Sequence, residues 1–168
     1  MTTSNDLTLA NSGKASLPYI ERSRQYYEAQ GFTAHYQYAQ FDDKPFAPLP
    51  KPLSNCTVGL VTTSSTYPRE PLEPRRVDSG STLFAPKTLF TADLSWDKDA
   101  THTDDIETYC PIESLQRLAD QGMIGALSRR FHCAPTEYSH RATLQQDAPE
   151  LLRRLREDEA DVALLVPL

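Results

Sequence analysis

The sequence predicts an α/β fold of the Rossmann-like or flavodoxin-like kind, with three layers and a short, mostly parallel sheet. Two apolar runs, at about residues 57–63 and 160–166, have the β-branched and aliphatic side chains of buried strands. A charged helix leads directly into the second run, which makes one half of a βαβ unit. Strands that are apolar on both faces belong inside a parallel sheet covered by helices. We therefore expect the final strand to lie inside the sheet.

Length and charge exclude several classes of protein. The 168 residues fit one domain, and the longest apolar run, Val162–Val166, is too short to span a bilayer. A formal charge of -6 argues against nucleic acid or an anionic membrane as a partner, because phosphate contacts need clustered Lys and Arg. Three scattered cysteines indicate no disulfide framework and favour a reducing cytoplasm. No cofactor is predicted.

The N-terminal third is expected to lie outside the main domain. Residues 1–16 are rich in Ser, Thr and Asn and are predicted to form a disordered tail. Within residues 17–54, a helix is predicted at 18–30 with Gly31 as its C-terminal stop, followed by an aromatic, proline-rich arm. That arm either wraps the domain or binds a partner. The α/β domain is predicted to span residues 55–168.

Five consecutive hydroxyl residues, 62–66, follow the first predicted strand. Ligands of open α/β sheets bind just beyond the carboxyl ends of the strands. Hydroxyl and backbone N–H donors at such a place bind anions, for example an amino-acid carboxylate, so Thr62, Thr63 and Ser64 are candidate substrate-binding residues. The alternative is a hydroxyl-rich loop without any ligand.

After a long proline-rich connection, a further strand is predicted at 89–95. An acidic segment, residues 97–107, follows and contains one histidine. Within it, His102 together with Asp104 or Asp105 are candidate catalytic residues, as acid/base or orienting groups. A solvated acidic loop is the alternative interpretation, since the spacing does not match a calcium-binding loop.

Cys110 and Pro111 open a predicted helix whose apolar residues share one face, and Gly122 supplies its left-handed end. Another strand is predicted at 125–132. Cys110 is a candidate catalytic thiol, and a small buried cysteine at a helix start is the alternative. No metal site is predicted, because the close Cys-x-x-Cys pairing of zinc sites is missing from the nearby cysteines and histidines. These residues are His102, Cys110, His132 and Cys133.

The helix before the last strand has a recognisable start. Asp147 is a predicted N-cap, Pro149 occupies the first turn, and Glu150 completes a capping box. The leucines of this helix share one face, whereas its arginines lie largely outside that face. The pattern predicts an amphipathic helix that packs on the sheet and delivers the chain into residues 160–166.

Four stretches occur in an order that is typical of one protein family. They are Phe41–Leu49 with Lys51–Ser54, Val58–Thr63, Cys110–Leu118 with Gly122–Gly125, and Asp158–Pro167. Together they cover most of residues 32–168 and resemble the glycine/sarcosine/betaine/D-proline reductase selenoprotein B family.

In that family the Val-Pro stretch is typically followed at once by Cys-Pro-Val-Cys-His, with selenocysteine replacing the first Cys in many members. The resemblance therefore implies a reactive selenol or thiol at position 169, directly after Leu168. A helix N-terminus and a Cys-x-x-Cys setting lower a thiol pKa below its free value of about 8.5. One expectation is that the reading frame was ended at a UGA codon for selenocysteine, which leaves the fold incomplete at its C-terminus. The alternative is a naturally short protein.

The resemblance implies an oxidoreductase that reductively cleaves a small amino-acid or betaine-like substrate. Its implied partners are that substrate, a thiol electron donor and further reductase subunits. The alternative is a non-catalytic module that binds a small carboxylate or a protein partner. Without a last βα unit, an apolar flank of the sheet is expected to be exposed, so a homo-oligomer is a further expectation.

Overall fold

The computed structural model describes residues 18–34, 38–43, 47–68, 76–91, 102–135 and 139–168. The chain divides into two compact units, Met1–Asp43 and Lys44–Leu168. The predicted tail, residues 1–16, lies outside the described residues. The end of the predicted arm belongs to the second unit, where the Lys51 ammonium lies 2.8 Å from the Asp161 carboxylate.

The described part of the first unit contains one helix, α1 (Tyr19–Ala29), which confirms the helix predicted at 18–30. Gly31 follows with a φ of 88°, the left-handed conformation that glycine adopts without a Cβ penalty. The Phe32 N–H then donates to the carbonyl of Tyr27 at 3.0 Å, and the two aromatic rings meet edge to face. These contacts close the C-terminal end of α1.

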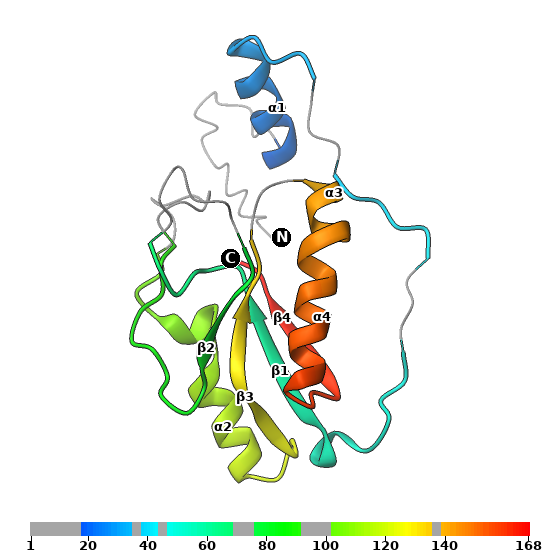
Figure 1. Cartoon of the computed structure of the whole chain (residues 1–168). Helices are drawn as coiled ribbons and strands as arrows, with labels where there is room; N and C mark the ends of the chain where they lie inside the picture. The colour runs from blue at the N-terminus through cyan, green and yellow to red at the C-terminus, as the bar shows by residue number, and fades with distance from the viewer. Residues whose placement is uncertain (1–17, 35–37, 44–46, 69–75, 92–101, 136–138) are drawn as a thin grey trace, which may run out of the picture. The chain divides into compact units, whose positions relative to one another are not determined.

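Four strands form the sheet of the second unit, in the spatial order β2-β3-β1-β4 (Figure 1). β1 (Thr57–Thr62), β3 (Ala126–Cys133) and β4 (Val162–Val166) are parallel and coincide with three of the predicted strands. β2 (Asp78–Ser81) runs antiparallel to β3. The predicted α/β fold with a short, mostly parallel sheet is confirmed.

The strand predicted at 89–95 is wrong where the structure describes it. Phe90 makes only an isolated antiparallel bridge with Ser65, and residues 92–95 lie outside the described residues. The fourth strand of the sheet is β2 instead, whose sequence Asp-Ser-Gly-Ser has none of the β-branched or aromatic residues that favour strands. Gly80 lies directly on the Phe131 ring, where a Cβ atom would not fit.

Helices cover both faces of the sheet, as the three-layer prediction requires. α2 (Ile112–Asp120) shares a buried apolar cluster with Leu60 of β1. α4 (Ala148–Glu157) covers the other face, where Leu155 lies so close to Gly59 that a Cβ atom would not fit there. Figure 1 shows the two helices on opposite sides of the strands. None of the helices in the described ranges is long and apolar enough to cross a lipid bilayer.

The ends of α2 follow the prediction. Pro111 occupies the position before its first residue, and Gly122 has the left-handed φ of 69° that glycine favours after a helix. Single 3₁₀ turns lie at η1 (Leu53–Asn55) before β1 and at η2 (Ile106–Thr108) before α2. Because α2 begins at Ile112 and ends before Gly122, the helix predicted to open at Cys110-Pro111 is confirmed.

The start of α4 differs from the prediction. Asp147 has helical backbone angles, and its side chain makes no capping hydrogen bond. The helix instead extends back through a π turn, η3 (Thr143–Asp147), and through α3 (His140–Ala142), to the side chain of Ser139, which caps the first turn. Pro149 lacks an N–H and crowds the turn before it, which favours the wider π geometry.

The last strand is not inside the sheet, which corrects the expectation of a strand covered on both faces. β4 pairs with β1 on one side, and no other described residue pairs with its outer edge. Three of its five residues are exposed, including Leu164 and Leu165. The apolar sequence of β4 predicted burial, whereas its position at the margin leaves an uncovered apolar flank of the expected kind.

Candidate functional site

The carboxyl ends of β1 and β4 lie side by side. Thr62 is in register with Val166, and the Leu168 N–H donates to the Thr63 hydroxyl oxygen at 2.8 Å. The hydroxyl-rich turn that follows β1 is therefore in direct contact with the residues that follow β4. Ligands of open α/β sheets bind at this edge, beyond the carboxyl ends of the strands. We take this edge as the candidate site.

The three candidate substrate-binding residues differ in their access to solvent. Thr62 and Ser64 are buried, and their hydroxyl oxygens lie 3.2 Å apart. The Ser64 N–H points at the Thr62 hydroxyl over 3.4 Å, so these groups bond within the turn. Thr63 is half-buried, which makes it the one member of the three that reaches the surface of this edge.

A carboxylate that the sequence did not single out lies at the same edge. Because β2 is antiparallel, its first residue, Asp78, is in register with Cys133 at the end of β3. The Asp78 carboxylate accepts hydrogen bonds from the N–H of Thr66, at 3.2 Å, and from the Thr66 hydroxyl. Asp78 thus holds the far end of the hydroxyl-rich turn. Asp78 could have been predicted at this edge only if residues 78–81 had been recognised as a strand that pairs with β3.

The candidate acid/base residues are exposed. The His102 ring lies 3.4 Å from the Asp104 carboxylate, and both side chains are mostly open to solvent. The Asp105 carboxylate accepts the Glu107 N–H and so caps η2. The Glu107 carboxylate in turn accepts N–H groups at the start of α2. These bonds agree with the alternative interpretation of a solvated acidic loop that organises helix starts.

Cys110 lies in the apolar core. Burial raises the pKa of its thiol to about 12, with the negative charge of Glu107 adding to the effect. A thiol with this pKa is protonated at neutral pH, whereas a nucleophile must be a thiolate. The position therefore favours the alternative of a small buried side chain. The other two cysteines, Cys56 and Cys133, are buried as well.

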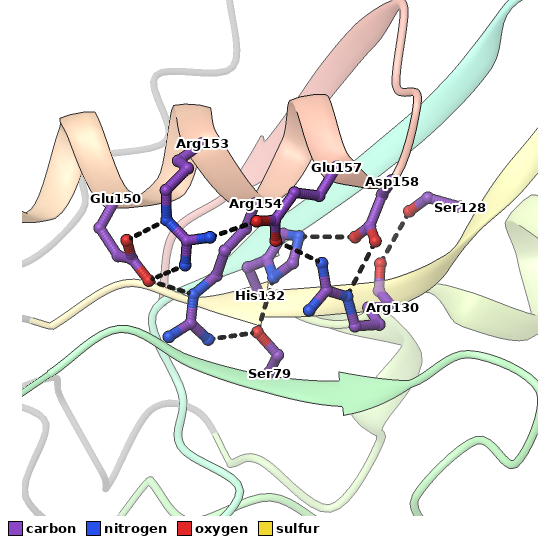
Figure 2. A network of polar contacts seen from close by, with 9 residues as sticks. All are labelled: Ser79, Ser128, Arg130, His132, Glu150, Arg153, Arg154, Glu157 and Asp158. Carbon is purple, nitrogen blue, oxygen red and sulfur yellow. Dashed lines mark hydrogen bonds and ion pairs between the residues drawn. The ribbon is translucent and has the colours of Figure 1, made fainter.

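A second polar cluster lies between α4 and the strands β2 and β3 (Figure 2). His132 of β3 is fully buried, with its Nδ1 atom 2.8 Å from the Ser79 hydroxyl and its Nε2 atom 3.0 Å from the Asp158 carboxylate. Arg154 of α4 donates to the same Ser79 oxygen at 2.7 Å. The Ser79 hydroxyl therefore joins α4 to β3, since it accepts from Arg154 and shares a hydrogen bond with His132 Nδ1.

Arg130 completes this cluster by donating to the Asp158 carboxylate at 2.8 Å, with Glu157 at 3.3 Å. Burial lowers the pKa of His132, and Arg130 and Arg154 act in the same direction, whereas Asp158 opposes them. His132 Nε2 and the Oδ2 atom of Asp158 are close but lack the alignment of a hydrogen bond. The ring is therefore held as a neutral imidazole.

Ser, His and Asp in contact are also the parts of a nucleophilic triad, but the geometry here serves another purpose. A catalytic serine must be reachable by substrate, and its base must be able to take up the proton. The His132 ring has no solvent access, and Arg154 occupies the Ser79 oxygen. The cluster is a clamp that fastens α4 to β2 and β3.

Sequence reasoning missed this clamp and considered His132 only as a zinc ligand. Among the described residues, no group of three or more His, Cys, Asp or Glu side chains lies close enough together to hold a metal ion. β3 has a bulge where residues 128–130 oppose the single residue Gly59, and because it adds two residues it leaves the alternation of faces unchanged. Arg130 and His132 therefore share the face beneath α4 by ordinary strand alternation, but nothing local in the sequence shows that Asp158, which follows α4, meets them.

Comparison of the chain with protein-family models, with curated protein sequences and with solved structures gives no match.

Proposed function

We propose that this chain is the α/β domain of a selenol- or thiol-dependent reductase resembling the selenoprotein B family, with the reactive residue directly after Leu168. The substrate is a small amino-acid or betaine-like molecule, and two electrons come from a thiol donor. Further reductase subunits and a cytoplasmic location are part of the proposal. The resemblance of four ordered stretches supports the assignment to this reductase class.

One structural observation carries the proposal. The 2.8 Å hydrogen bond from the Leu168 N–H to Thr63 supports it, because Leu168 lies beside the hydroxyl-rich turn at the end of β1 and a residue that followed Leu168 would begin there. A selenolate or thiolate there lies at the sheet edge where open α/β folds bind their ligands. A helix beginning after β4 would direct its N-terminal N–H groups at the same atom and lower its pKa.

The hydroxyl-rich turn supplies the substrate-binding part of the proposal. Thr63 is the half-buried hydroxyl at this edge, and its proton points at the Leu168 carbonyl over a long 3.5 Å contact. A substrate carboxylate would replace that contact, so Thr63 is the residue expected to orient a substrate beside position 169. Thr62 and Ser64, which bond to one another, hold the turn in shape. His102, Asp104 and Asp105 stay candidate acid/base groups, although Asp105 also caps η2.

The nucleotides that follow codon 168 test this proposal. The expected result is a TGA codon followed, in the same frame, by codons for a motif of the form x-Pro-Val-Cys-His and then a helical pattern. A different stop codon, or a TGA followed by no such motif in frame, would remove the basis for a reductase of this kind.

A second candidate function is a non-catalytic module that binds a small carboxylate. The burial of all three cysteines, and the raised pKa of the Cys110 thiol, favour it for residues 1–168 taken alone. Calorimetry of the 168-residue protein with glycine, sarcosine, glycine betaine and D-proline separates the two functions. Tight binding without any thiol chemistry supports the module, and Thr63→Val is then expected to weaken the binding.

A further inference from the structure

The two margins of the sheet are built differently. β2 is four residues long and polar, and its side chains are engaged by Thr66 at Asp78 and by Arg154 at Ser79. β4 reads Val-Ala-Leu-Leu-Val and contains no charge, no proline and no glycine. Natural proteins protect exposed edge strands with charges, prolines or bulges, because the open N–H and C=O groups pair with other strands. Residues 162–166 have none of these protections.

We propose that β4 pairs with β4 of a second copy of this chain, antiparallel about a twofold axis at Leu164. The open main-chain groups of the edge require an extended strand as the occupant. A twofold axis makes the interface self-complementary, so residue 162 faces residue 166 of the second copy and residue 163 faces residue 165. Val then meets Val, Leu164 meets itself, and the small Ala163 faces the large Leu165. The four-stranded sheet of one copy then continues, through the two paired β4 strands, into the four-stranded sheet of the other copy.

Side chains on both faces of β4 fit this pairing. Leu164 is in register with Leu60 on the α2 face, and Leu165 is in register with Val61 on the α4 face. Leu165 is 66% exposed, against 39% for Leu164, and inserts beside the small Ala163 of the second copy. The match of large to small side chains is specific to this sequence paired with itself.

α4 adds a second apolar element beside this edge. Leu155 faces β1 and Arg154 reaches β2, so the helical repeat turns Leu152 towards the β4 side of the helix. Leu152 is 48% exposed. Pairing of β4 brings the two copies of α4 alongside each other across the axis, and the leucine then lies between them.

Charge and area set the strength of the dimer. Asp161, the nearest acidic group before β4, is neutralised by Lys51 at 2.8 Å, so the edge itself carries no repulsion. The net charge of -6 on each copy still opposes association at long range, so added salt strengthens the dimer.

The size of the contact sets how tightly the two copies bind. A five-residue antiparallel ladder is about 17 Å long, and stable interfaces bury about 800 Å² per partner. A contact made by one five-residue strand and one leucine of α4 is expected to bury less than this, so we expect a reversible dimer.

Sedimentation velocity of the 168-residue protein over a range of concentrations tests this pairing, separately from the reactivity proposed above. The wild-type protein is expected to shift from monomer to dimer, and Leu165→Lys is expected to stay monomeric at every concentration. Leu83→Lys is the matched control, because Leu83 is 67% exposed and lies after β2, at the other margin. A monomeric wild type, assemblies larger than a dimer, or equal losses in both variants would contradict the proposal.

Cysteine cross-linking tests the register. Leu164 lies on the proposed axis, so Leu164→Cys places two thiols opposite each other at a Cα separation within the range of disulfides. Mild oxidation is expected to give a covalent dimer in this variant. Ala163→Cys faces Leu165 of the second copy and is expected to give little. Cross-linking of Ala163→Cys but not of Leu164→Cys would overturn the proposed register, and cross-linking of neither would overturn the pairing.

Discussion

The two faces of the sheet are built from different chemistry. On the α2 face, Leu60 and Phe131 belong to a fully apolar cluster, which burial alone stabilises. On the α4 face, the buried residue at the same level of β3 is His132, held by Ser79 and Asp158. An apolar layer tolerates changes in pH and salt, whereas a buried polar clamp depends on the charge of each member. The comparison indicates that the α2 face supplies most of the stability and the α4 face fixes the position of α4.

Leu60→Ala is expected to have the largest effect, because Leu60 is fully buried on the α2 face. Truncation of a buried leucine removes apolar contacts and leaves a cavity, at a cost of about 2–5 kcal/mol in the free energy of unfolding. Urea unfolding followed by circular dichroism measures it. Leu83→Ala, at an exposed leucine, is the control and should change stability by less than about 0.5 kcal/mol. Similar losses in both variants would contradict the assignment of the core.

Asp158→Ala is expected to have the next largest effect, because the Asp158 carboxylate accepts a hydrogen bond from Arg130 at 2.8 Å and lies 3.0 Å from the buried His132 ring. Hydrogen bonds to charged groups contribute about 1.5–3 kcal/mol, and the partial exposure of Arg130 puts the expected loss at the lower end of that range. The same unfolding experiment measures the loss. Glu157→Ala is the matched control one residue earlier, since the Glu157 side chain is half-exposed and bonds the same arginine. An effect of Asp158→Ala no greater than that of the control would mean that the clamp is not formed.

The pH dependence of stability is expected to come from the α4 face. The pKa of His132 is lowered in the folded protein, so the unfolded chain binds a proton more readily near its ordinary pKa of 6.5. Stability is therefore full above pH 6.5 and falls as the pH drops from there through the lowered folded value. In His132→Asn this part of the slope should disappear when unfolding is followed from pH 8 to pH 5. An unchanged slope in the variant would assign the titration to another group.

Arg153→Ala is expected to have the smallest effect. Arg153 and Glu150 form an ion pair at 2.7 Å on the outer surface of α4, where the pKa of Glu150 is lowered to about 2 by its arginine neighbours. Solvent and salt screen such exposed pairs, so little of this shift is available as stability. Unfolding at low and high salt should show only a slight loss, confined to low salt. A large loss of unfolding free energy that persists in high salt would contradict this, because it would mean that the Arg153–Glu150 pair helps to hold α4 on the sheet.

The apolar and turn-forming residues allowed much of the fold to be predicted. The runs of β-branched and aliphatic residues predicted β1 and β4, and the amphipathic pattern predicted α2. Gly31 and Gly122 marked the ends of two helices. These signals are local, so a single segment carries them. β2 could not be predicted, since its polar residues become a strand only by pairing with β3.

The site was predicted less completely, because its parts meet only in the folded chain. The contact between Thr63 and Leu168 joins residues 105 positions apart, and it agrees with the expectation that β4 ends beside the hydroxyl-rich turn. The edge position of β4 was missed, because an apolar strand at a margin has the same sequence as one inside a sheet. The clamp was missed because His132, Asp158 and Ser79 come from three separate elements.

The reactivity of a cysteine placed at position 169 tests the central claim most directly, namely that β4 delivers the next residue to a site beside Thr63. The protein is extended after Leu168 by Cys-Pro-Val-Cys-His, and alkylation of the first cysteine is followed by mass spectrometry as a function of pH. We predict a thiol pKa below about 8.5 in the folded protein, rising to that value in urea. Thr63→Val should raise it, and Thr57→Val, at the other end of β1, should not. Equal pKa values in the folded and unfolded protein would contradict the account.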